Sequence, residues 1–101
     1  MTRHNQFVIR NDLSVALTLN IEPEGALFSL GTGEVVTVTD VFTKAPVTVK
    51  FAHSDNGAPI ICIWPGDGEV RVEKDGVDVL DLLPQDVGVQ GTEHYAVNIV
   101  P

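Results

Sequence analysis

Apolar and polar side chains alternate with a period of two along most of this chain. Between Val15 and Glu22, valine, leucine and isoleucine occupy every odd-numbered position, and threonine, asparagine and glutamate are among the residues between them. Residues 34–41 and 47–51 repeat the alternation. Successive side chains of a β-strand point to opposite faces, so the pattern predicts strands with one buried face.

Turn-forming residues divide this alternation into short segments, because glycine, proline, asparagine and aspartate favour the backbone angles of turns. The predicted strands are residues 7–10, 15–22, 26–30, 34–41, 47–51, 59–64, 69–74, 77–80 and 95–99, and the last is a candidate partner for the first. No stretch has the 3.6-residue period of an amphipathic helix, so the sequence predicts an all-β fold. Roughly seven to nine short, mostly antiparallel strands favour a β-sandwich, with a small β-barrel as the alternative.

Two segments predict particular features of this fold. Residues 59–64 are apolar on both faces, which is typical of a central strand that is covered on both sides. The pair Asp75-Gly76 separates two predicted strands by two residues, which is the usual sequence of a tight β-hairpin.

Length and composition agree with one globular unit. The chain has 101 residues, of which 44% are hydrophobic and 20% charged, and both values are ordinary for a globular domain. Chains of this length usually form one domain around one core. We therefore expect a single β domain over residues 1–101, with residues 1–5 as a flexible N-terminal arm.

The chain is strongly acidic, with a net charge of −8 from 14 acidic and 6 basic residues. Nucleic-acid binding depends largely on Lys and Arg that displace counterions, so this charge argues against nucleic acid as a partner. A membrane is also disfavoured, because anionic lipid surfaces repel acidic proteins and no apolar run approaches the roughly 20 residues of a span. Residues 1–6 lack the apolar run of a signal peptide, and Cys62 is the single cysteine, so we expect a cytoplasmic protein without an internal disulfide.

No group of residues has the spacing of a known reaction centre or metal site. The histidines, His4, His53 and His94, lie far apart, whereas a cupin-type metal site would need a His-x-His pair. The Asp-Gly and Asn-Gly steps lack the spacing of a calcium loop and are better interpreted as turns. Cys62 lies between two isoleucines and is better interpreted as a core residue than as a nucleophile. We therefore expect no catalytic residue, no metal and no cofactor.

Polar residues at predicted strand ends are the best candidates for a ligand site, because loops at strand ends often carry function. These candidates, with one aromatic residue, are Glu22, Glu24, His53, Asp55, Trp64 and Asp67. A pocket that joins His53 to at least two of the carboxylates would support an enzyme or a small-ligand-binding protein. The single Trp64 is better interpreted as the rim of the core than as a binding platform, because carbohydrate platforms usually need several aromatic rings.

Part of the chain carries a series of strand-and-turn motifs. Asn11 and Ser14 are followed by Glu22-Pro23, by Leu30-Gly31-Thr32-Gly33 and later by Trp64-Pro65-Gly66. With these motifs the chain resembles a group of short, uncharacterised bacterial proteins over about two-thirds of its length. The resemblance implies an all-β fold and a bacterial origin, and it implies no activity for any residue.

Binding is the class of function that these observations favour. Each candidate catalytic residue has a structural explanation, so we predict a non-enzymatic β module that serves in protein interaction or as a component of an assembly. Sheet edges and faces are natural binding surfaces, and short valine-rich strands suit homodimerisation through an edge strand or an uncovered face. The alternative hypothesis is a small-ligand-binding protein or enzyme with a site in the strand-end loops around His53.

Overall fold

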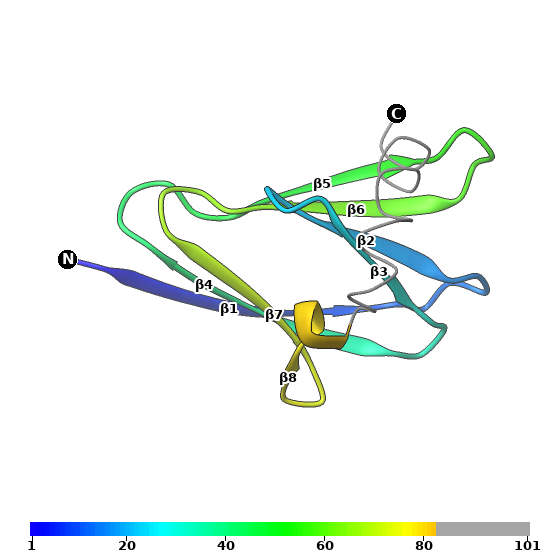
Figure 1. The fold of residues 1–101 in the computed structure, drawn as a ribbon, viewed down its shortest axis with the longest axis horizontal. Helices are drawn as coiled ribbons and strands as arrows, with labels where there is room; N and C mark the ends of the chain where they lie inside the picture. Colours follow the sequence, from blue (N-terminus) through cyan, green and yellow to red (C-terminus); the bar gives the residue numbers. More distant parts are fainter. Residues whose placement is uncertain (83–101) are drawn as a thin grey trace.

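The computed structural model describes residues 1–82, which form two four-stranded β-sheets around a shared core (Figure 1). The elements, in chain order, are β1 (Arg3–Arg10), β2 (Leu17–Ile21), β3 (Ala26–Leu30), β4 (Val35–Phe42), β5 (Thr48–His53), β6 (Pro59–Trp64), β7 (Glu69–Lys74), β8 (Val77–Asp78) and the short 3-10 helix η1 (Val79–Leu82). The first sheet has the strand order β1-β4-β7-β8, and the second has the order β3-β2-β6-β5. The predicted all-β sandwich is therefore confirmed. No helix within residues 1–82 is long and apolar enough to cross a membrane.

Most strand boundaries agree with the alternation in the sequence. β3, β6 and β7 have the predicted bounds, and β2, β4 and β5 differ from the predicted ranges by one or two residues at each end. The predicted hairpin is present, because Asp75 (φ 53°) and Gly76 (φ 80°) join the antiparallel strands β7 and β8. The strand predicted at 95–99 and His94 lie outside the described residues.

Two elements differ from the sequence-based expectation. β1 begins at Arg3 and pairs with β4 along its whole length, so most of the segment expected as a flexible arm, residues 1–5, belongs to a strand. Backbone hydrogen bonds hold such a ladder together, so polar side chains do not exclude it. The strand predicted at 77–80 has only two residues before η1 begins, and there the Asp78 carboxylate accepts a hydrogen bond from the backbone N–H of Leu80 at 2.9 Å.

A parallel pairing joins the two halves of the second sheet. β2 and β3 form one antiparallel pair, and β5 and β6 form another. β2 and β6 run parallel, with Leu19 opposite Ile61 and Ile21 opposite Ile63. β6 therefore has a neighbour on each side, which confirms the central position that its apolar sequence predicts.

The core lies between the two sheets and is aliphatic. Its buried residues are Leu17, Leu19, Ile21, Leu30, Val36, Val38, Ile61, Ile63, Val72 and Val79. Full burial of each such side chain contributes about 1.5–3 kcal/mol. Cys62 is half-buried and points away from this core, because Ile61 and Ile63 on either side of it point inward. The prediction that Cys62 is a core residue is therefore wrong.

A buried asparagine fixes the crossing from the first sheet to the second. Asn11 follows β1 and is only 1% exposed. Its two side-chain N–H groups donate to the carbonyl oxygens of Val15 and Leu30, each at 2.9 Å, and its Oδ1 accepts from the N–H of Leu13 at 2.8 Å. One side chain therefore holds the loop between β1 and β2 against the end of β3.

Candidate functional site

The structure separates the candidate site residues into two groups at opposite ends of the second sheet. His53 pairs with Pro59, at the beginning of β6, and Asp55 lies in the adjoining turn. Glu22 lies at the other end of β6, where its N–H donates to the carbonyl of Ile63 at 2.9 Å. A six-residue strand is about 20 Å long, so the structure does not bring His53 together with Glu22 or its neighbour Glu24.

Asp67 holds a loop in place. Its carboxylate accepts three hydrogen bonds, from the backbone N–H groups of Thr43 at 2.9 Å, Lys44 at 2.8 Å and Ala45 at 3.0 Å. These bonds, the one from Thr43 foremost, lower the pKa of Asp67 below its ordinary value of 3.8. Asp67 therefore fastens the connection between β4 and β5 to the one between β6 and β7.

We expect the acid sensitivity of the fold to depend on Asp67. Because folding lowers the pKa of Asp67, its ionised carboxylate stabilises the fold at pH values above 3.8. This contribution is lost as the pH falls through the pKa that Asp67 has in the folded state. The Asp67→Asn variant should be less stable at neutral pH and should lose less stability below pH 3.8 than the unchanged chain does. Urea unfolding across this pH range measures both effects.

The control for this prediction is Asp55→Asn, which removes the same charge from another turn. It should leave stability at neutral pH nearly unchanged. Equal acid dependence in Asp67→Asn and the unchanged chain would contradict the role of Asp67.

Trp64 is partly exposed at the end of β6 and has a cation as its neighbour. The Lys50 ammonium lies 5.5 Å from the centroid of the indole ring. Such contacts contribute about 0.5–1 kcal/mol at exposed sites. Trp64 therefore packs against Lys50 of its own sheet.

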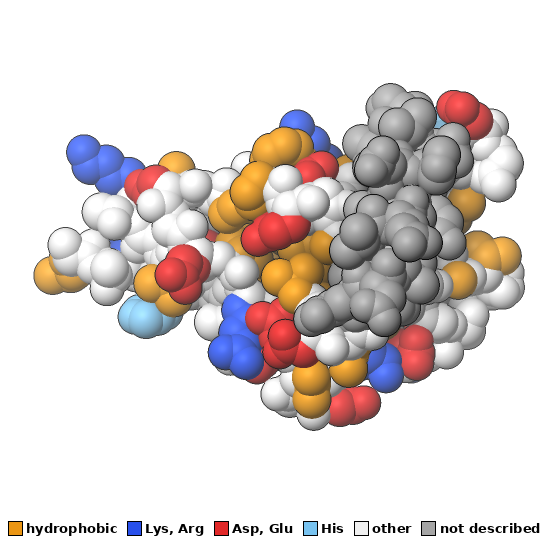
Figure 2. Space-filling model, in the orientation of Figure 1, with side chains coloured by type: hydrophobic (Ala, Val, Ile, Leu, Met, Phe, Trp, Pro, Cys, Tyr) orange, Lys and Arg blue, Asp and Glu red, His pale blue; other side chains and the backbone are white. Residues whose placement is uncertain are grey.

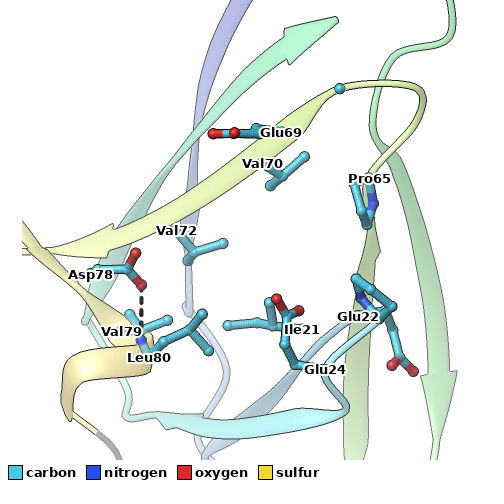
Figure 3. A pocket seen from close by; sticks show the side chains of 12 residues that line it. Ile21, Glu22, Glu24, Pro65, Glu69, Val70, Val72, Asp78, Val79 and Leu80 are labelled. Carbon is cyan, nitrogen blue, oxygen red and sulfur yellow. Dashed lines mark hydrogen bonds between the residues drawn. The ribbon is translucent and has the colours of Figure 1, made fainter.

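An acid-rimmed hollow of about 400 Å³ lies between the β2–β3 turn, β7 and η1 (Figure 3). Four acidic residues, Glu22, Glu24, Glu69 and Asp78, are among the residues that line it. Its apolar lining includes Ile21, Val70, Val72, Val79 and Leu80. In the space-filling view, apolar side chains lie between carboxylates near the centre of this face (Figure 2).

The residues described around the hollow do not form a recognisable catalytic or metal-binding group. Figure 3 shows the carboxylates of Glu22, Glu24 and Glu69 pointing in different directions, and among residues 1–82 no three His, Cys, Asp or Glu side chains are grouped so that they could hold a metal ion. The described lining includes no histidine, cysteine or serine. The sequence indicated Glu22 and Glu24 but not Glu69 and Asp78, because no pattern shows that the β2–β3 turn lies beside β7 and β8.

A second surface feature is an apolar groove of about 290 Å³ beside β5, the edge strand of the second sheet. Phe51 on this strand is 81% exposed. The groove also has Leu13, Leu17, Ile60 and Ile61 in its lining, with Arg10 and Asp12 among the polar residues. Sequence reasoning missed Phe51, since its place in the alternation indicated a core residue.

The comparisons with known proteins give no further guide. No protein-family model matches the chain, and neither a curated protein nor a solved structure gives a significant match. The resemblance to short bacterial proteins therefore stays a prediction.

Proposed function

We propose that this chain is a non-enzymatic assembly module that associates with a second copy of itself through the edge of β5. The observation that carries the proposal is the exposure of Phe51 on an edge strand beside an apolar groove. Removing an aromatic ring from water stabilises an association by about 1.5–3 kcal/mol. The chain has a single cysteine, Cys62, and so cannot form an internal disulfide, which is consistent with a protein of the reducing cytoplasm.

β5 lacks most of the sequence features that prevent an edge strand from pairing with another chain. Prolines, bulges and several charges usually protect such edges. β5 has one permanent charge, at Lys50, and five of its six residues are exposed. In β3, the other edge strand of this sheet, only Ser29 is exposed. The edge of β5 is therefore the better template for a second chain.

The position of the charge favours one register for the pairing. Two copies of β5 related by a two-fold axis pair antiparallel, and residues opposite each other share a face. An axis at Lys50 sets two ammonium groups opposite each other, which is unfavourable. An axis at Phe51 sets the two rings opposite each other and places Lys50 opposite Ala52. The cross-strand aromatic pair adds about 0.2–1 kcal/mol, so the Phe51 register is the expected one.

Sedimentation over a range of concentrations tests the association. The unchanged chain should form a dimer, and the Phe51→Ser variant should have a dissociation constant higher by about tenfold or more, which corresponds to about 1.4 kcal/mol of lost apolar contact. The matched control is Val8→Ser, because Val8 is 60% exposed on the outer face of the first sheet. Monomers at every concentration, or equal weakening by both substitutions, would contradict the proposal.

A cross-link tests the register separately. In a Cys62→Ser background, and at a protein concentration above the dissociation constant of the Phe51→Ser variant, the substitution F51C should give a dimer linked by a disulfide under mild oxidation, because only this position faces its own copy. The substitution K50C is the control and should cross-link much more slowly. The reverse order would show that the axis passes through Lys50.

The alternative of a ligand site around His53 receives no support from this arrangement. His53 and Asp55 lie at one end of the second sheet, and Glu22 and Glu24 lie at the other. Asp67 is engaged by the β4–β5 loop. An interaction module is therefore the function that the geometry supports best.

A further inference from the structure

Most of the acidic residues that line the acid-rimmed hollow lack a basic partner in the described chain. Arg71 lies 3.9 Å from Asp78. Glu22, Glu24 and Glu69 form no salt bridge within residues 1–82. Carboxylates gathered around a cleft with apolar walls produce a concentrated negative potential there. The hollow therefore favours a cationic group.

The apolar floor of the hollow limits the kind of cation that fits. Figure 3 shows Val70 and Leu80 directed into the space that Glu24 and Glu69 border. Lys and Arg side chains lay their apolar stems along such surfaces and keep the charged group at the edge. The lining therefore suits a long basic side chain better than a bare cation.

The chain has two basic side chains that are available for such a contact. It contains six Lys and Arg residues, all within residues 1–82. Four of these have a partner in the same chain, either a carboxylate or an indole ring: Arg10, Lys50, Arg71 and Lys74. The other two, Arg3 and Lys44, are exposed and form no salt bridge within the described chain.

Arg3 and Lys44 lie at the same end of the first sheet and form what we call the basic tip. Arg3 is opposite Phe42, the last residue of β4, and Lys44 follows two residues later. Figure 1 shows the start of β1 and the β4–β5 connection at this end. Arg3 and Asn5 share the face of β1 on which Phe7 packs against the core, yet both are exposed. The tip therefore extends past the core and is open to a partner.

We propose that the basic tip of one copy docks in the acid-rimmed hollow of a second copy. The stems of Arg3 and Lys44 pack on the apolar floor, and their charged groups lie beside Glu22 and Glu24. Tip and hollow are different surfaces, so each copy takes part twice, once with each. This contact is separate from the pairing through β5 and does not depend on it.

Sedimentation of the full chain in a Phe51→Ser background tests this contact without the β5 pairing. At about 0.15 M salt the Debye length is about 8 Å, so the general repulsion between two copies of net charge −8 is largely screened. The copies should associate as the concentration rises to about 1 mM. Replacing Glu22 and Glu24 by glutamine should raise the dissociation constant about tenfold, or about 1.4 kcal/mol for two exposed ion pairs.

The matched control replaces Asp55 and Asp75, which lie in two turns outside the hollow, by asparagine. It removes the same number of negative charges, so the general repulsion between copies decreases equally in both variants. Its dissociation constant should not rise above that of the parent. Unchanged circular dichroism in both variants shows that the sandwich remains folded.

An exchange of charges tests which surfaces meet. One variant carries Arg3→Glu and Lys44→Glu, and the other carries Glu22→Lys and Glu24→Lys. Each variant alone sets like charges against each other in the contact, so neither should associate. An equimolar mixture sets opposite charges together again and should restore association. Both variants keep a net negative charge, so a general attraction does not explain this result.

Three results would overturn the proposal. The first is a monomer at every concentration up to about 1 mM in the Phe51→Ser background. The second is an equal dissociation constant in the glutamine variant and its asparagine control. The third is a mixture that associates no better than its two components. If Phe51→Ser leaves association unchanged while the glutamine variant weakens it, the tip contact stands and the pairing through β5 fails.

Discussion

Replacing Asn11 by aspartate is expected to lower the free energy of unfolding by about 3–5 kcal/mol, although the two side chains have nearly the same shape. Asn11 is buried, and both of its side-chain N–H groups donate to carbonyl oxygens, those of Val15 and Leu30. Aspartate offers no donor when ionised, so each contact becomes one between two acceptors. The change also buries a charge without a partner.

The matched control for this prediction is Asn56→Asp in the β5–β6 turn. There the side-chain Oδ1 only accepts, from the hydroxyl of Ser54 and from the N–H of Ala58 at 3.1 Å. A carboxylate preserves both contacts, so urea unfolding should show a change within about 0.5 kcal/mol. Similar losses at the two positions would mean that the donors of Asn11 do not determine its contribution.

Replacing Gly68 or Gly66 by alanine should lower the free energy of unfolding by about 3 kcal/mol or more, because the added Cβ would overlap backbone atoms of the neighbouring segment. A Cβ at Gly68 would overlap the carbonyl oxygen of Val41 in β4, and a Cβ at Gly66 would overlap that of Ala45. Both neighbours are backbone atoms, so no side-chain rotation relieves the overlap. Moving the β6–β7 loop away from these carbonyl groups would also break the hydrogen bonds between Asp67 and the β4–β5 loop.

The control substitutions are Gly57→Ala and Gly76→Ala. Both glycines have a positive φ, of 86° and 80°, and an added Cβ meets nothing within 4 Å at either position. Alanine there costs about 1 kcal/mol of backbone strain. Thermal or urea unfolding should therefore rank Gly66 and Gly68 as the more sensitive positions, and the opposite ranking would show that the backbone rearranges at low cost.

Local sequence patterns predicted the strands well because each strand carries its own alternation. β6 was identified as a central strand because it is apolar on both faces, and the β7–β8 hairpin because Asp75-Gly76 suits a tight turn. The start of β1 was missed, since its first four residues are polar and their pairing depends on β4, about 35 residues away in sequence.

The candidate site was less predictable, because it depends on which strand ends meet. Glu22 and Glu24 lie in the lining of the hollow, but the contributions of Glu69 and Asp78 follow from the strand order of the two sheets. Asp67 was predicted as a ligand residue, and in the structure its carboxylate accepts hydrogen bonds from three backbone N–H groups of the β4–β5 loop. A carboxylate in a turn has the same sequence signature in both roles, and only the neighbouring N–H groups distinguish them.

The parallel pairing of β2 with β6 has a consequence for how the chain folds. β2–β3 and β5–β6 are hairpins that can form locally, but Thr18 and Ile60, which lie opposite each other, are 42 residues apart in the chain. The entropy of closing so long a loop must be offset before the contact is stabilising. We therefore expect the second sheet to assemble late from two hairpins that form early. β4, which belongs to the other sheet, lies in the stretch of chain that connects these hairpins.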